Sequence, residues 1–331
     1  MTRYGRLTVS KQHVMGQYDS PFGISAYLQE KLVYLGQKEV YEEASATVEH
    51  LMDLEVCAKQ IERLCHHWGA RSEEIEADPV AADTTYLMVD GSMILTRDRD
   101  EERHALKWRE MKLARIFGEY HRLELTENRR CIWHSAYVAH LGTSEDLFEK
   151  LAPQLATATP VVLGDGAPWI WTQVEKYWPD AIEILDYYHA SESLHHFAGE
   201  ALACSVFTNQ QEKETWVQAQ IDALFDDKIL QVLKHIAALE CRCERSREAQ
   251  RKLLSYYDAN WSRMYYGRYK RRGYMIGSGP IESAHRYVIQ QRMKLSGQRW
   301  SVHGAQYMAN LRAVYESGNW NRLTQMIRKA A

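Results

Sequence analysis

The sequence predicts a mixed α/β fold, with helices before the sheet and a long helical segment in the C-terminal half. Three observations support this prediction. Residues 24–69 place apolar side chains three or four positions apart, which is typical of amphipathic helices. Short aliphatic runs bounded by turn residues follow between residues 85 and 185, and these are typical of buried strands. Residues 187–258 then return to helical spacing, with Leu, Ile, Ala and Trp among charged residues.

The N-terminal part is expected to consist of an arm and a helical region. Residues 1–20 are polar and unpatterned, so we interpret them as the arm. The helical region spans residues 21–82 and contains three periodic segments, at residues 24–36, 39–54 and 56–69. It ends in an acidic, Pro-containing stretch that is typical of a linker.

Two roles fit the second and third of these helices. They could form a helix-turn-helix whose DNA-facing residues are Lys59, Gln60, Arg63 and His66. They could instead serve packing or dimerisation. Residues 1–80 hold eight Lys and Arg against thirteen Asp and Glu, and this negative balance favours the second role because DNA affinity depends on neutralising phosphates.

The central region is expected to form the sheet. Residues 85–89 and 92–96 flank an Asp90-Gly91 pair, which predicts a hairpin with Asp90 at its bend or at a strand end. Strand-like segments follow at residues 107–119 and 131–141. A capped helix, a strand, a second helix and a further strand are then predicted at residues 143–155, 161–164, 168–177 and 182–185. Antiparallel strands followed by β-α-β units suit an RNase H-like mixed sheet, although other α/β folds share this order.

Three acidic residues occupy positions from which a fold would direct them outward. Asp90 and Asp165 each end a short apolar run, and Glu282 opens a helix after a Gly-Ser-Gly-Pro turn. Two such strands side by side would bring their carboxylates together, and Mg²⁺ prefers oxygen ligands. This layout predicts a two-metal phosphodiester site. The alternatives are tight turns at the two Asp-Gly pairs, and for Glu282 a position that complements the helix dipole and pairs with Arg286.

The sequence around these acids resembles that of a known protein family. Residues 277–300, GSGPIESAHRYVIQQRMKLSGQRW, closely resemble the C-terminal catalytic block of bacterial insertion-sequence transposases of the ISKra type. Further stretches look like the same family in the same order: DGS at Asp90, KWREMKLARIF from Lys107, YVAHLG from Tyr137, GDGAPWIW from Gly164 and LDYYHA from Leu185. The resemblance covers roughly residue 22 to the C-terminus.

The resemblance implies an RNase H-like domain, related to that of Mutator-like transposases, whose Asp, Asp and Glu bind two divalent cations. Carried over to this sequence, the catalytic and metal-binding triad falls on Asp90, Asp165 and Glu282. A Cys/Asp-x-x-His signature of the group falls on Asp186 and His189. The implied domains are a catalytic core in two parts, at residues 83–190 and 263–331, separated by a helical insertion at residues 191–262. The group commonly carries a Cys-rich N-terminal segment that this sequence lacks.

Positive charge gathers around Glu282. The whole chain has a net charge of −3, but residues 263–299 carry nine positive side chains against one acid, a local charge of +8. We call these nine residues the basic set and predict that they contact DNA: Arg263, Arg268, Lys270, Arg271, Arg272, Arg286, Arg292, Lys294 and Arg299. Tyrosines interleaved at residues 265–274 suit stacking on an unpaired base. A solvated Arg-rich loop is the alternative.

His189 has two interpretations. It could be a structural hydrogen-bonding residue, or it could contact the scissile strand or orient the nucleophile beside the metals, and we include it in the predicted catalytic set. His285 lies one helical turn after Glu282 and could likewise contact the scissile strand or orient the nucleophile.

The predicted function is a DDE-type DNA transposase that uses two Mg²⁺ or Mn²⁺ ions. Its partners would be double-stranded transposon ends, target DNA and further copies of itself. A catalytically idle DNA-binding derivative and another RNase H-like nuclease are the alternatives. No run of 18 apolar residues and no signal-peptide core occur, so a cytoplasmic, nucleoid-associated protein without membrane contact is expected. The six cysteines include no CxxC pair and are expected to be reduced.

Overall fold

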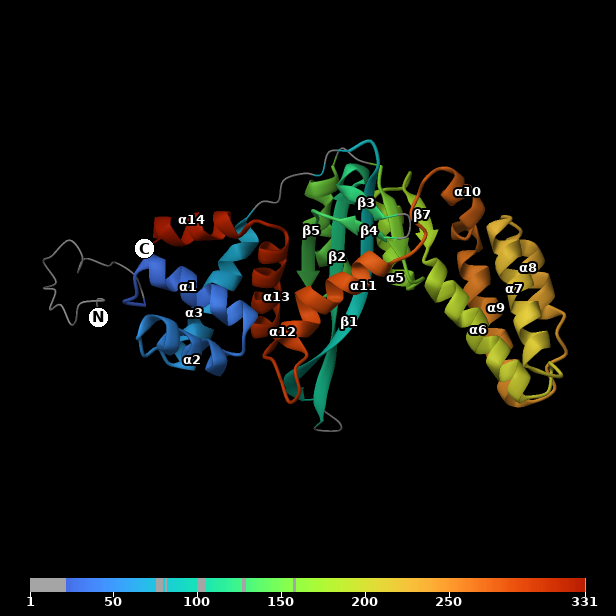
Figure 1. The fold of residues 1–331 in the computed structure, drawn as a ribbon, viewed down its shortest axis with the longest axis horizontal. Coiled ribbons are helices and arrows are strands. Elements are labelled where there is room, and N and C mark those ends of the chain that lie inside the picture. Colours follow the sequence, from blue (N-terminus) through green and yellow to red (C-terminus); the bar gives the residue numbers. More distant parts are fainter. Residues whose placement is uncertain are drawn as a thin grey trace, which may run out of the picture.

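The computed structural model describes residues 22–75, 80, 82–99, 105–126, 129–156 and 159–330. Figure 1 shows three parts in a row along the longest axis: a group of helices that includes both ends of the described chain, a central sheet, and a set of helices that extends away from the sheet. The predicted arm at residues 1–20 lies outside the described residues.

The central sheet contains three antiparallel strands followed by two parallel ones. Its members are β1 (Thr85–Arg99), β2 (Leu106–Gly118), β5 (Ala136–His140), β6 (Val161–Gly164) and β7 (Ile182–Leu185). The spatial order is β5-β2-β1-β6-β7, with β1 parallel to β6 and β6 parallel to β7. The predicted RNase H-like mixed sheet, with a helical region before it and a helical insertion after it, is confirmed.

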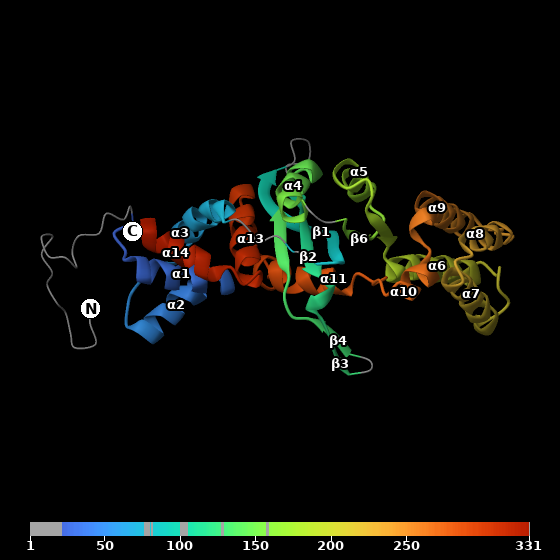
Figure 2. The same cartoon turned by 90° about the horizontal axis from the view of Figure 1, so that it is seen from above.

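Helices cover both faces of this sheet. α4 (Ser144–Leu151) and α5 (Pro168–Tyr177) lie on one face, and α11 (Gly279–Ala284) lies on the other (Figure 2). Strand β6 is buried along its whole length, because it has neighbours on both edges and helices on both faces. Its aliphatic residues therefore form the middle of the core.

The strand that carries Asp90 differs from its prediction. β1 runs without a break through Asp90 and Gly91, which pair with Leu113 and Lys112 of β2, so the predicted hairpin at Asp90 is wrong. The antiparallel ladder continues as far as Arg99, and its hydrogen bonds outweigh the turn preference of the Asp-Gly pair. A small hairpin that the sequence did not predict, β3 (Arg122–Thr126) with β4 (Arg129–Ile132), projects from the sheet (Figure 2).

The N-terminal helices pack against the C-terminal ones. α1 (Ala26–Lys38), α2 (Tyr41–Met52) and α3 (Ala58–Arg71) lie together with α13 (Val302–Glu316) and α14 (Trp320–Ala330) (Figure 1). The buried side of α3 is formed by Ile61, Leu64, Cys65, Trp68 and Gly69, so this helix has a packing role. Buried polar bonds reinforce the contact, since Arg312 of α13 donates to Gln37 Oε1 of α1 over 2.8 Å.

The helices beyond β7 form a separate bundle, which we call the helical arm: α6 (Tyr187–Ala203), α7 (Gln210–Phe225), α8 (Ile229–Ala237) and α9 (Glu244–Asn260). A disulfide joins Cys204, after α6, to Cys243, before α9, so the expectation of reduced thiols is wrong for this pair. The reason is tertiary: α6 and α9 pack side by side and bring these two helix ends together. No helix in the described ranges combines the length and apolarity that a membrane span requires.

One member of the basic set lies inside the protein. Arg292, in α12 (Gln291–Met293), is 2% exposed, and its Nε donates to Gly36 O over 3.0 Å. Its guanidinium lies over the rings of Tyr41 and Trp300, at 4.9 and 5.3 Å from their centroids. The prediction that Arg292 contacts DNA is therefore wrong, because burial makes its charge inaccessible to phosphate.

We expect Arg292→Ala to lower the free energy of unfolding by about 2–4 kcal/mol, since it removes a charged hydrogen bond and two buried cation–π contacts. Urea denaturation measures this loss. Arg286→Ala is the matched control, because Arg286 is exposed on the neighbouring turn and should change stability by less than about 0.5 kcal/mol. Equal effects of the two substitutions would show that Arg292 is not a core residue.

Candidate functional site

The site is built around three aspartates at the end of the sheet where β6 and β7 have their carboxyl ends. In the parallel pair β1–β6, Met88 lies opposite Leu163, so Asp90 and Asp165, each two residues further on, occupy matching positions. Asp186 directly follows β7, and its N–H donates to Gly164 O over 2.8 Å. The three aspartates thus lie at the carboxyl ends of β6 and β7 and at the matching level of β1, which continues to Arg99. Open α/β sheets commonly bind ligands at the carboxyl ends of their strands.

A tight turn positions Asp165. Its Oδ1 accepts a hydrogen bond from Ala167 N over 2.9 Å, and its main-chain carbonyl accepts one from the hydroxyl of Tyr256 over 2.7 Å. Gly166 follows at φ +96°, and a Cβ there would lie 2.7 Å from the Tyr256 ring. Glycine is therefore required twice, for backbone conformation and for space, and α9 of the helical arm holds the turn in place.

Asp186 is the most enclosed acid of the site. It is fully buried and caps α6, accepting hydrogen bonds from the N–H groups of Tyr188 and His189. It also accepts bonds from the His189 ring and from Ser278, whose N–H and hydroxyl donate over 3.0 and 2.9 Å. Burial by itself would raise the pKa of Asp186, but the hydrogen bonds from His189 and Ser278 hold that pKa below its ordinary value.

Glu282 reaches the site from α11. Ser278 precedes the helix and Pro280 occupies its first turn, as the sequence predicts. The hydroxyl of Ser278 lies 3.0 Å from Glu282 Oε1 as well as near Asp186, so it links the two acids. Arg115, a buried residue of β2, donates to Pro280 O over 2.7 Å and fastens α11 to the sheet.

The charges of these residues are coupled. Burial is the largest cause of the raised pKa of Asp90, and together with the carboxylates of Asp165 and Glu282 it brings this pKa to about 6. The bond to Asp186 raises the pKa of His189 to about 9, so this ring is cationic at neutral pH. His285 is 3% exposed and its Nε2 lies 3.4 Å from Asp90 Oδ2, but burial lowers its pKa to about 4 and keeps it neutral.

The donor set fits divalent cations. Asp90, Asp165 and Glu282 supply hard carboxylate oxygens, and their mutual repulsion is the kind that a bound cation relieves. A different trio, Asp186, His189 and Glu282, has ligand atoms within 4.8 Å of one another. In that trio, however, Asp186 and His189 Nδ1 are already bonded to each other. Asp186 therefore holds His189 and α11, and Asp90, Asp165 and Glu282 are the acids whose carboxylate oxygens could bind a cation.

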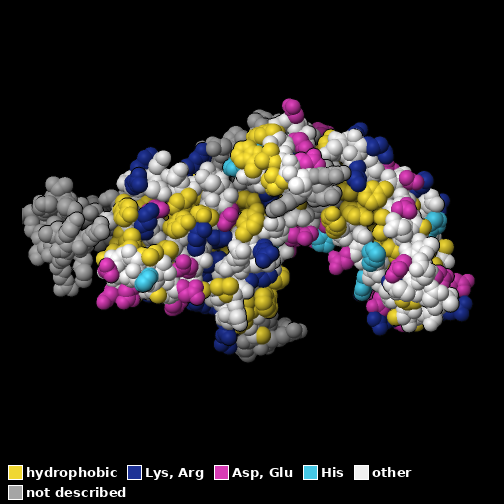
Figure 3. Space-filling model, in the orientation of Figure 1, with side chains coloured by type: hydrophobic (Ala, Val, Ile, Leu, Met, Phe, Trp, Pro, Cys, Tyr) yellow, Lys and Arg dark blue, Asp and Glu magenta, His cyan; other side chains and the backbone are white. Residues whose placement is uncertain are grey.

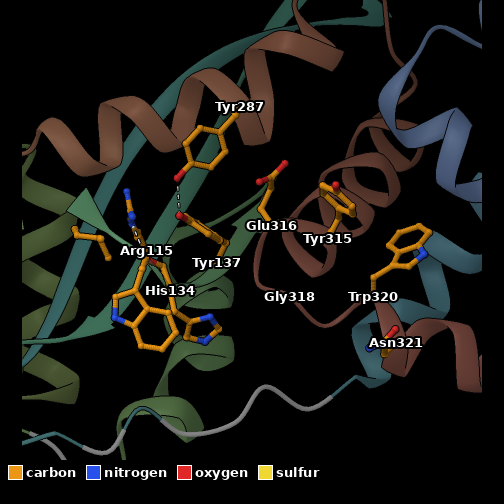
Figure 4. Close-up of a pocket in the computed structure, with 12 residues that line it drawn as sticks. Arg115, His134, Tyr137, Tyr287, Tyr315, Glu316, Gly318, Trp320 and Asn321 are labelled. Carbon is orange, nitrogen blue, oxygen red and sulfur yellow. Dashed lines mark hydrogen bonds between the residues drawn. The ribbon is translucent and has the colours of Figure 1, made fainter. Parts of the chain in front are cut away.

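The site opens onto a hollow. Figure 3 shows the molecule hollowed between the β1–β2 hairpin and the helical arm. The helical arm begins directly after Asp186, at Tyr187 of α6. A pocket of about 470 Å³ at the arm is lined by Asp165 and His189 together with residues of α6 and α9. Another pocket, of about 550 Å³, lies between the sheet and α13–α14 and contains Glu316 but none of the three acids (Figure 4). Of these two pockets, only the one beside the helical arm is lined by an acid of the site.

The basic set is divided by the fold. Arg268, Lys270, Arg271 and Arg272 are exposed in or beside α10 (Tyr266–Arg271), whereas Arg286, Lys294 and Arg299 are exposed beyond α11. Arg263 is partly buried, pairs with Glu183 and lies over the Trp171 ring. Within the same stretch, Tyr266 and Tyr269 are buried and unavailable for stacking on a base. The set therefore forms two exposed groups, while Arg263 is partly buried and Arg292 is buried.

Comparison with known families gives a match to the C-terminal half of the chain. Residues 156–330 match an uncharacterised protein family, UPF0236. The chain belongs to UPF0236. The segment shared with UPF0236 starts just before β6 and contains Asp165, Asp186, His189 and Glu282, while Asp90 precedes it. Comparison with curated proteins gives no match.

Sequence reasoning missed several residues of this UPF0236 site. Ser278 precedes α11, but its hydroxyl contacts two acids, Asp186 and Glu282, instead of capping a main-chain N–H of that helix. Arg115 bonds to Pro280, 165 residues away in the sequence, and Tyr256 bonds to Asp165, 91 residues away. No local sequence pattern indicates such contacts. The Asp186-x-x-His189 spacing was the available signal for the buried acid, since residues three apart share one face of a helix turn.

We expect Asp186→Ala to lower the free energy of unfolding by about 3–5 kcal/mol, because several buried donors lose their common acceptor. His189→Ala should cost less, about 1 kcal/mol, since this ring is 39% exposed. Urea denaturation of both variants measures the difference.

The control for Asp186 is Asn209→Ala, an exposed cap of α7 that accepts a single bond from Glu212 N. A lone cap of this kind is worth about 1 kcal/mol. If Asp186→Ala cost no more than Asn209→Ala, Asp186 would be an ordinary helix cap.

Proposed function

We propose that this chain is a DDE-type DNA transposase, which cleaves and joins DNA strands with divalent cations held by Asp90, Asp165 and Glu282. The observation that carries the proposal is the convergence of these acids: two stand in register on adjacent parallel strands, and the third lies close enough to raise the pKa of Asp90. The resemblance of the surrounding sequence to ISKra-type transposases supports the same assignment.

The roles of the residues follow from their surroundings. When bound, two Mg²⁺ or Mn²⁺ ions would activate a water or a 3′-hydroxyl and offset the charge of the leaving oxygen. Because His189 Nδ1 is bonded to Asp186, Nε2 is the nitrogen that would donate to a phosphate oxygen. Its raised pKa, about 9, supplies this donor as a cation. The neutral ring of His285 packs behind Asp90 and keeps water from that side.

The place of the DNA follows from shape and charge. The hollow in Figure 3 leads to the acids, and the two exposed groups of basic residues stand on α10 and beyond α11. A duplex in the hollow would contact both groups through its phosphates, which contribute most of the affinity of such complexes. The chain outside residues 263–299 carries a net charge of −11, which favours these two groups over the rest of the protein as the place of DNA contact.

We expect Asp90→Asn, Asp165→Asn or Glu282→Gln each to reduce DNA cleavage by about 10³-fold or more, because each removes a metal ligand without changing shape. Cleavage and joining are followed on gels with DNA that carries the insertion element's ends, in Mg²⁺ or Mn²⁺, and should stop on addition of EDTA. DNA affinity should persist in all three variants.

Asp98→Asn is the matched control, since Asp98 lies further along β1 and forms an ion pair with Arg109. It should cleave normally. Cleavage without joining by the wild-type chain would favour an RNase H-like nuclease, and stable binding with neither reaction would favour the catalytically idle derivative.

We expect replacement of Arg268, Lys270 and Arg272 by Ala to weaken binding to all DNA sequences and to lower the slope of log affinity against log salt by about 2–3, at ~0.9 per phosphate contact. Fluorescence anisotropy over a salt series measures the slope. Replacing Arg328 and Lys329, exposed in α14 at the other end of the molecule, is the control and should leave the slope unchanged. An unchanged slope in the first variant would remove α10 from the DNA interface.

A further inference from the structure

An exposed aromatic ring stands inside the site motif. Tyr188 lies between Asp186 and His189 in the first turn of α6, and it is 63% exposed. Its neighbour Tyr187 packs against the rings of Phe225 and Tyr266. The helix therefore anchors Tyr187 inside the helical arm and leaves Tyr188 exposed to solvent beside the acids.

The backbone of the GSGP turn supports this ring. A Cβ at Gly277 would lie 2.5 Å from Cε2 of Tyr188, so the ring rests directly against the glycine. Ser278, the next residue, is bound to Asp186, which also caps the helix that carries Tyr188. The position of the ring is thus set by the same bonds that assemble the acids, and an ordered ring loses little entropy when a ligand stacks on it.

The ring also borders a pocket close to the site. This pocket has a volume of about 1,030 Å³ and lies between α11, the β3–β4 hairpin and the end of α10. Its wall includes Gly277 and Ser283, which flank the Ser278–Glu282 pair, so pocket and acid site share one wall. The aromatic and charged side chains that line it are Tyr188, Tyr274, Tyr287, Arg115, Arg122, Lys270, Glu119 and Glu124. Arg122 is paired with Glu119, so Lys270 and Arg115 are the cations of this pocket without a carboxylate partner among the contacts of the described residues.

We propose that this pocket receives an unpaired nucleotide next to the scissile phosphate, and that Tyr188 stacks on its base. The inference rests on the proposed function, because it places the phosphate at the neighbouring acids. Aromatic rings beside cations are the usual platform for unpaired bases, since every base has a stacking face and every linkage a phosphate. Unstacking a nucleotide beside the cut would expose the strand to the site, as enzymes that act within a duplex require.

The first test measures stacking without cleavage. The probe is a duplex with a single nick and 2-aminopurine at the 3′ end of the nick, bound to the Asp90→Asn chain. We expect binding to change the 2-aminopurine fluorescence, Tyr188→Ala to abolish the change, and Tyr188→Phe or Tyr188→Trp to retain it. Tyr27→Ala is the matched control, because Tyr27 is also 63% exposed but lies in α1.

The second test measures cleavage. Tyr188→Ala should slow the reaction by about 10–100-fold, the scale of one lost stacking contact, while Tyr188→Phe cleaves normally. A substrate with an abasic position beside the cut should remove the difference between wild type and Tyr188→Ala, since no base remains to stack.

The two tests separate this inference from the proposed function. A fluorescence change that depends on Tyr188 supports the nucleotide pocket even if the wild-type chain never cleaves DNA, an outcome that would defeat the transposase proposal. A fluorescence change that survives Tyr188→Ala overturns the nucleotide pocket, whatever the rate of cleavage. Failure of the chain to bind the nicked duplex at all overturns both.

Discussion

The buried carboxylate of Asp186 is the interaction on which the rest of the site depends. It ends β7, caps α6 and accepts bonds from Ser278 ahead of α11, so the sheet, the helical arm and the last part of the site meet at one group. A buried charge without partners would cost several kcal/mol, and this cost is avoided when all three parts are in place. The interaction therefore couples the folding of distant segments to the assembly of the acids.

Close to Asp186, the structure brings together the three carboxylates of Asp90, Asp165 and Glu282. Burial and the nearby carboxylates of Asp165 and Glu282 raise the pKa of Asp90 to about 6, and this repulsion opposes folding. Conflicts of this kind are typical of functional sites, where a ligand offsets them. The cavity in Figure 4 offers a contrast, because Glu316 there bonds to Arg312 of its own helix. Repulsion between several carboxylates thus distinguishes the acid site from this cavity.

The elements that sequence predicted best are those with strong local signals. β6 (Val161–Gly164), α5 (Pro168–Tyr177) and β7 (Ile182–Leu185) have the predicted bounds, because aliphatic runs are bracketed there by Gly, Pro and Asp. The prediction at Asp90 was wrong because an Asp-Gly pair is a turn signal only where no neighbouring strand continues the ladder. Arg292 was misplaced for a similar reason, since nothing in its local sequence indicates the rings of Tyr41 and Trp300.

The sequence by itself determined which residues could form a site and on which kinds of element they stand: carboxylates after apolar runs, an acid after a GSGP turn, and Asp186 three residues before His189. Those features are local, so they can be recognised in one segment. Only the tertiary structure decided that β1 and β6 are parallel neighbours, that Ser278 bridges Asp186 and Glu282, and that the basic set divides in two. These are contacts between segments far apart in the chain, and their geometry depends on how the whole core packs.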